Sequence, residues 1–158
     1  MQPSDPQTAG CIFCAIVRSE APATFLHQDE LVVAIMDIRP VQPGHLLVVP
    51  RAHAKLIPEL DGATLARLWS VATDLNQALR ASPLPVEAVS VYVADGDAAG
   101  QEVAHVHIHL IPRRAHDGFG FRFPPGYGTQ PGRAALEAIA DQIRRGSSQL
   151  SAPDTRGD

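Results

Sequence analysis

The stretch that decides the fold of this chain is His105-Val106-His107-Ile108-His109-Leu110-Ile111-Pro112-Arg113. Polar and apolar residues alternate along it, and in an extended strand successive side chains point to opposite faces. The pattern therefore predicts a strand over residues 103–111 with three imidazoles on one face and apolar side chains on the other. Because imidazole titrates near neutral pH, such a row suits nucleophilic chemistry, proton transfer or metal binding.

The remaining segments predict an α+β domain with a largely antiparallel sheet, because most of the predicted strands are joined by short turns or by one helix. Helical periodicity runs from Asp61 to the stop at Ser82-Pro83, and again from Arg133 to Arg145 before Gly146, with a short turn over residues 12–18. Apolar runs predict five strands, over residues 24–28, 31–37, 45–49, 86–94 and 103–111.

The composition predicts one ordinary folded domain. The chain has 158 residues, a net charge of −4 and 45% hydrophobic residues, which suffices for a real core. We expect this domain over residues 11–146, between polar, disordered tails at 1–10 and 147–158.

The same composition argues against several classes of partner. Basic residues do not cluster with aromatic ones, so no extended nucleic acid is expected. The apolar runs are too short to cross a bilayer, and the first residues lack a secretory signal. We therefore expect a cytoplasmic protein with no membrane partner.

The two cysteines, Cys11 and Cys14, have the spacing C-x-x-C. In a reducing compartment this spacing is typical of metal binding or of a redox pair rather than of a structural disulfide. Spacing alone leaves both interpretations open.

Taken together, these segments resemble the histidine-triad (HIT) family of nucleotide hydrolases and transferases. The resemblance implies a five-stranded, largely antiparallel sheet with two main helices, and a homodimer joined edge to edge. An exposed sheet edge also favours pairing with a second chain. The matching motifs are Cys11–Cys14, Ile35–Pro40, Pro43–His53, Gly100–Val103 and His105–Arg113.

The resemblance also implies a reaction at the α-phosphate of a purine nucleotide derivative, such as an adenosine phosphoramidate or a dinucleoside polyphosphate. His107 would attack the phosphorus and form a covalent nucleotidyl-histidine, while His109 contacts the phosphate and passes a proton. For this, His107 must present one bare nitrogen, so we expect its other nitrogen to donate to a fixed acceptor such as a backbone carbonyl. The chemistry itself requires no cofactor.

The nucleotide-binding residues follow from the same resemblance. Asp37 matches an aspartate that bonds the ribose hydroxyls, a natural role for a carboxylate acceptor. The small-residue turn over residues 95–102 is expected to bring backbone N–H groups close to phosphate oxygens. The nucleotide-binding residues that match the family here are Gly100, Gln101, Glu102 and Val103. The residues that match the apolar slot for the base are Ile12, Phe13, Ile16, Ile35, Ile38 and Leu47.

A structural zinc ion is the cofactor that the resemblance implies, since some family members carry zinc at the matching positions. Here those positions hold Cys11, Cys14, His53 and His105, two thiolates and two imidazoles, the ligand types of a closed tetrahedral site. In that arrangement His105 would fix the strand beside His107. His45 would lie behind the catalytic histidines as a supporting residue.

One position departs from the family pattern. Ala94 stands where an Asn or Gln usually contacts the phosphate or the leaving group, and loss of such a donor costs on the order of 100-fold in rate. A non-enzymatic nucleotide sensor or scaffold is therefore an alternative. A second alternative makes the three histidines ligands of a catalytic zinc with a bound water, but it leaves the cysteines and His53 without a shared purpose.

Overall fold

The computed structural model describes residue 8 and residues 10–147, in two compact units, 1–119 and 120–158. The tails predicted at 1–10 and 147–158 lie almost wholly outside the described residues. The expectation of one domain over 11–146 stays a prediction.

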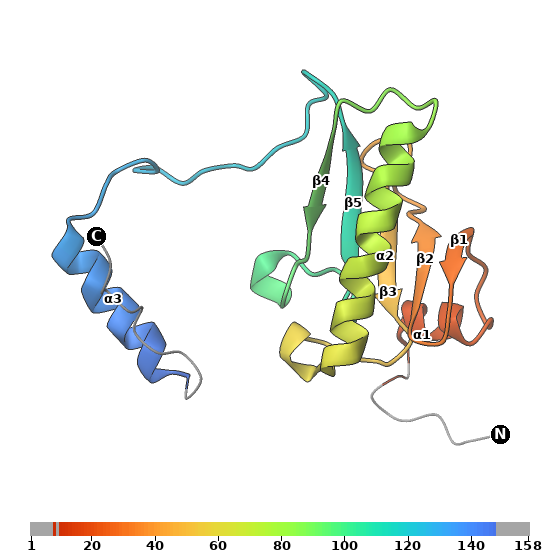
Figure 1. Ribbon diagram of the computed structural model, residues 1–158, viewed down its shortest axis with the longest axis horizontal. Coiled ribbons are helices and arrows are strands. Elements are labelled where there is room, and N and C mark those ends of the chain that lie inside the picture. Colours follow the sequence, from red (N-terminus) through yellow and green to blue (C-terminus); the bar gives the residue numbers. More distant parts are fainter. Residues whose placement is uncertain (1–7, 9, 148–158) are drawn as a thin grey trace, which may run out of the picture. The chain divides into compact units, whose positions relative to one another are not determined.

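The first unit is built on a five-stranded antiparallel sheet, which confirms the predicted α+β fold. Neighbouring strands are antiparallel throughout, and β1 and β4 form the two edges (Figure 1). In spatial order the strands are β1 (Phe25–Gln28), β2 (Val32–Met36), β3 (Leu46–Pro50), β5 (Ile108–Arg113) and β4 (Ala88–Tyr92).

Helices α1 (Ile12–Val17) and α2 (Gly62–Ala81) belong to the first unit, with 3-10 turns η1 (Ile57–Glu59) and η2 (Asp97–Ala99). Helix α2 begins where the Asp61 side chain accepts the Thr64 N–H at 2.8 Å, and it ends just before Pro83. Within residues 8 and 10–147, no helix is long and apolar enough to cross a membrane.

Helix α3 (Arg133–Arg145) lies in the second unit and has the predicted bounds. The apolar side chains of its periodic pattern are exposed to solvent, among them Leu136, Ile139 and Ile143.

The central strands are covered on both faces, which explains why β2 and β3 are apolar at nearly every position. Helix α2 packs across one face of the sheet (Figure 1), where Leu68 contacts the cluster that contains Leu46 and Val48. Phe13 and Ile16 of α1 pack on the opposite face, against Val33, Ile35, Leu47 and Val49. Successive residues of β3 thus point to opposite sides, as strand geometry requires.

Strand β5 begins at Ile108, so the prediction that it starts at residue 103 was wrong. The His105 N–H donates to the Val103 carbonyl at 2.7 Å, and the Val106 N–H to the Ala54 carbonyl at 2.8 Å. These bonds lie outside the sheet ladder. His105 and His107 therefore precede the strand, and only His109 is part of it.

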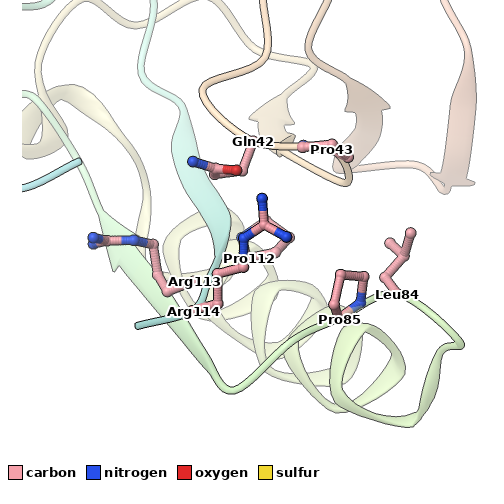
Figure 2. Close-up of a pocket in the computed structure, with 7 residues that line it drawn as sticks. All are labelled: Gln42, Pro43, Leu84, Pro85, Pro112, Arg113 and Arg114. Atoms are coloured by element: carbon pink, nitrogen blue, oxygen red, sulfur yellow. The ribbon is translucent and has the colours of Figure 1, made fainter. Parts of the chain in front are cut away.

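A small hollow of about 70 Å³ lies where the loop before β3 meets the connection between α2 and β4 (Figure 2). It is far below the several hundred Å³ of typical small-molecule sites, so it is a packing gap between these segments. Its lining residues are Gln42, Pro43, Leu84, Pro85, Pro112, Arg113 and Arg114.

Candidate active site

A cavity of about 590 Å³ opens on the face of the sheet that α1 covers. Its volume falls within the range of small-molecule sites. His45 also lines it, and the only predicted nucleotide-binding residue outside its lining is Gln101. The predicted residues that it brings together are Ile12, Phe13, Ile16, Ile35, Asp37, Ile38, Leu47, Gly100, Glu102, Val103, His107 and His109.

His107 presents one nitrogen to this cavity. Its Nδ1–H donates to the backbone carbonyl of His105 at 2.7 Å, the type of bond that the sequence led us to expect. Burial lowers the pKa of His107, which favours the neutral ring. A neutral imidazole that donates through Nδ1 has a lone pair on Nε2. The edge of the Phe13 ring packs against the imidazole, with centroids 5.1 Å apart.

His109 lies beside His107, with ring centroids 4.7 Å apart, and is held from two sides. Its Nδ1 is 3.1 Å from Nε2 of His45. Its ring stacks on Tyr92, with centroids 4.5 Å apart and planes 10° from parallel. Burial, followed by the neighbouring His107 and His45, lowers the pKa of His109 to about 4.

The hydrogen bonds of His45 determine which nitrogen of His109 carries the proton. Nδ1 of His45 accepts the Val41 N–H at 3.2 Å, and burial lowers the pKa of His45, so its proton lies on Nε2. That proton is donated to Nδ1 of His109, which leaves the proton of His109 on Nε2. The two catalytic candidates thus offer different groups, a lone pair on His107 and an N–H on His109.

Asp37 connects the hydrogen-bonded rings of His45 and His109 to the rim of the cavity. Its Oδ1 accepts the Arg39 N–H at 2.7 Å, while its Oδ2 is 3.4 Å from Nδ1 of His45. Arg39 in turn pairs with Glu102 at 2.6 Å, and both of these side chains are largely exposed. Such an exposed pair contributes little to stability, but it sets a cation and an anion at the rim.

Three N–H groups of the turn before the histidines already have acceptors within the protein. The N–H groups of Ala99, Gly100 and Gln101 donate to carbonyls within the turn. The Gln101 side chain is bonded at both polar atoms, because its Nε2 donates to the Lys55 carbonyl at 2.8 Å and its Oε1 accepts the Gly96 N–H at 3.0 Å. Gln101 holds the shape of the turn and lies outside the cavity lining.

The structure also shows that Asp95 does not replace the amide missing at Ala94. The Asp95 carboxylate accepts the Ile57 N–H at 2.9 Å, which directs it to η1. Ala94 is buried and absent from the cavity lining.

Sequence reasoning missed several residues that line the cavity. Tyr92 is the most informative of them, because its register partner in β5 is His109. The alternation of Val89, Val91 and Val93 toward the α2 face places Tyr92 on the opposite face, a signal that could have identified it. The other missed residues are Ala21, Pro22, Ala23, Met36, Arg39 and Val41.

The four predicted metal ligands come together behind His107. Sγ of Cys14 is 3.2 Å from Nδ1 of His53 and 3.6 Å from Nδ1 of His105, and Sγ of Cys11 is 3.4 Å from Nδ1 of His105. The two Nδ1 atoms are 3.3 Å apart. Nε2 of His105 donates to the Pro50 carbonyl at 2.9 Å, so its Nδ1 lone pair faces the cysteines.

These distances fit a tetrahedral ion. Zinc bonds of about 2.3 Å to sulfur and about 2.0–2.1 Å to nitrogen place sulfur and nitrogen ligands about 3.5 Å apart, and two nitrogens about 3.3 Å apart. Among the described residues, the clustered ligand atoms form one group of Cys11, Cys14, His53 and His105 and another of Asp37, His45 and His109. His107 belongs to neither group, so the three histidines do not share one metal.

Comparison with known proteins identifies the family. The family model described as "HIT domain" matches residues 18–116. The chain belongs to the HIT family. An uncharacterized HIT-like protein of Borreliella burgdorferi is 40% identical over 71% of this chain and 81% of its own length. The adenosine 5'-monophosphoramidase HNT1 of Saccharomyces cerevisiae is 35% identical over 67% of this chain and 64% of its own.

Solved HIT structures share the fold. A HIT family protein from Bacillus anthracis superposes with a TM-score of 0.79 at 31% identity, covering 88% of this chain and 98% of the other. A zinc-bound histidine triad family protein from Mycobacterium smegmatis gives a TM-score of 0.67 at 34% identity, covering 87% and 98%.

Proposed function

We propose that this HIT protein is a nucleotide hydrolase that cleaves at the α-phosphate of an adenosine phosphoramidate or a dinucleoside polyphosphate through a covalent nucleotidyl-His107 intermediate. The observation that carries the proposal is the pairing of the bare Nε2 of His107 with the N–H of His109 in one cavity. A related protein named as an adenosine 5'-monophosphoramidase supports this substrate class.

The reaction has two steps. In the first, Nε2 of His107 forms a bond to the α-phosphorus, and the bond from phosphorus to the leaving group breaks. The leaving group takes a proton from His109 in its imidazolium form, which the negative phosphate favours over the neutral ring. In the second step water attacks phosphorus, the bond to His107 breaks, and the water proton returns to His109. Nucleoside monophosphate is released and both histidines are restored.

The cavity has groups suited to the rest of the nucleotide. The apolar residues around Phe13, Ile35 and Leu47 form a slot of the kind that accepts a purine ring. Asp37 stands at the rim, where a carboxylate can accept the ribose hydroxyls. We place the phosphate between this slot and the two catalytic histidines.

The test is release of nucleoside monophosphate from adenosine 5'-monophosphoramidate and from a dinucleoside polyphosphate. The wild type should release product, and His107→Ala should lose at least about 1000-fold in rate because no nucleophile remains. His116→Asn is the matched control, since His116 is exposed and outside the cavity lining. A short quench in base, in which the phosphorus–nitrogen bond of the adduct is stable, followed by mass spectrometry should find the nucleotidyl group on His107. Nucleotide binding without turnover of either substrate would instead support the sensor or scaffold role.

We also propose a structural zinc ion held by Cys11, Cys14, His53 and His105. The fit of the four ligand atoms to a tetrahedral ion supports it, as does the zinc-bound M. smegmatis relative. Bound there, zinc would cross-link α1 to the segment before β5. It would stabilise the fold without touching the substrate.

A homodimer paired through the edge strand β4 is our proposal for the assembly. β4 has the sequence Ala-Val-Ser-Val-Tyr, with no charge and no proline to block pairing. The other edge, β1, is shorter and irregular between Phe25 and His27. Light scattering on the full chain should give the mass of two chains, and the mass of a single chain at micromolar concentration would contradict this proposal.

A further inference from the structure

The family pattern has a side-chain amide that contacts the phosphate or the leaving group, and this chain lacks it. Position 94 has no amide, Asp95 is bonded to η1, and the side-chain amide of Gln101 is bonded to Lys55 and Gly96. The N–H groups of residues 99–101 are used as well. Of the other side-chain donors that line the cavity, Arg39 is paired with Glu102 and His45 donates to His109. A second free side-chain donor to a phosphate, besides His109, must come from another residue of the lining.

Tyr92 is placed to supply it. Its ring lines the cavity and stacks on His109, the residue that lies beside the nucleophile. Val89 and Val91 of β4 and Val93 just after it pack toward α2, so Tyr92, two residues before Ala94, points to the opposite face.

The electrostatic surroundings keep the hydroxyl protonated. Burial raises the pKa of Tyr92 above its ordinary value, and the carboxylates of Asp37 and Glu102 raise it further. Both of these residues line the same cavity, so the hydroxyl senses the charges of the cavity rim. A protonated phenol in this position is a hydrogen-bond donor and not a competing anion.

We propose that the Tyr92 hydroxyl is a substrate-contacting donor to the phosphate oxygens and takes over the task of the amide missing at position 94. This inference rests on the proposed nucleotide site. The phenol gives a hydrogen bond without giving up its proton, so no bond to Tyr92 forms or breaks during the reaction.

The test separates the hydroxyl from the ring. Tyr92→Phe keeps the stack on His109 and removes only the donor. It should lower kcat/KM for adenosine 5'-monophosphoramidate by about 10- to 100-fold, the effect of one hydrogen bond to a charged group. Tyr127→Phe is the matched control, because Tyr127 is the other tyrosine of the chain and lies outside the cavity lining.

Position 94 provides the rescue experiment. In the Tyr92→Phe background, Ala94→Asn should recover at least about tenfold of the lost kcat/KM, because it returns the side-chain amide of the family pattern. Thermal melts establish that each variant is folded. A folded double variant with no recovery would refute the idea that Tyr92 does the work of an amide at position 94.

Binding measurements keep the proposal testable even if the protein does not turn over either substrate. By calorimetry, Tyr92→Phe should weaken the affinity for AMP by about tenfold or more and leave the affinity for adenosine unchanged, because only AMP carries the phosphate. Equal AMP affinities in wild type and variant, or no AMP binding by the wild type, would overturn the role of Tyr92. AMP binding that depends on Tyr92 without turnover would refute the hydrolase and keep this donor.

Discussion

Removing one cysteine should cost the protein its metal, whereas removing the nucleophile should not. Cys14 is the central ligand, since its sulfur lies within 3.6 Å of the Nδ1 atoms of both His53 and His105. His107 contributes its Nδ1–H to a carbonyl and is absent from this ligand group. We therefore expect about one zinc per chain in the wild type and in His107→Ala, and close to none in Cys14→Ala.

The loss should also appear as reduced stability. An ion that binds the folded chain at 1000 times its dissociation constant stabilises it by about 4 kcal/mol. For a chain of this size 1 kcal/mol moves the melting temperature by roughly 2–4 °C, so the shift should be about 8–16 °C. His53 adds to this loss of stability. Its Nε2 is buried without a hydrogen-bond partner, so the bond from its Nδ1 to the ion is needed to hold the ring in place.

The assay is metal analysis by mass spectrometry on dialysed protein, together with thermal melts with and without a chelator. Chelation should lower the melting temperature of wild type and His107→Ala equally and leave Cys14→Ala unmoved. Equal zinc loss in His107→Ala and Cys14→Ala would refute the four-ligand site and restore the three-histidine metal. Full zinc content in Cys14→Ala would refute the assignment of Cys14 itself.

Two further predictions concern stability. Gly44→Ala should destabilise the chain by about 2–4 kcal/mol in urea unfolding, because Gly44 has a φ of +91° and an added Cβ would lie 2.8 Å from Leu84 and 3.0 Å from Pro112. Gly62→Ala, at an open helical position, should be neutral or slightly stabilising. The pKa of His109 is lowered from 6.5 to about 4 in the fold, so its contribution of about 2–3 kcal/mol is fully present above pH 6.5 and is lost as pH falls toward 4. His109→Gln should therefore lose less stability than the wild type between pH 7 and pH 4.5, and identical losses would contradict this assignment.

Local patterns predicted those parts of the fold that depend on nearby residues. Helix α3 has the predicted bounds because Gly146 ends a periodic apolar pattern. The helix after Asp61 was predictable because its cap and its proline stop are both in the adjacent sequence. The assignment of Cys11, Cys14, His53 and His105 to one cluster needed the family resemblance, since these residues are far apart in the chain.

The features that the sequence did not predict correctly depend on contacts between residues far apart in the chain. The start of β5 was misplaced because Val106 donates to Ala54, a partner that periodicity does not reveal. Gln101 was predicted among the nucleotide-binding residues, but it lies outside the cavity lining, and its side chain donates to the carbonyl of Lys55. Tyr92 was missed because its importance comes from the register that pairs it with His109 across two strands.

His105 links the cluster of proposed metal ligands to the proposed nucleophile more directly than a neighbouring position on a strand would. Its Nδ1 faces the cysteines, its Nε2–H donates to Pro50, and its backbone carbonyl accepts the Nδ1–H of His107. That carbonyl fixes which nitrogen of His107 is bare, and the position of the carbonyl is fixed by the side chain of the same residue. A disturbance of the cluster should therefore reach the nucleophile through the tautomer of His107, lowering kcat more than it raises KM, although no ligand of the cluster lines the cavity.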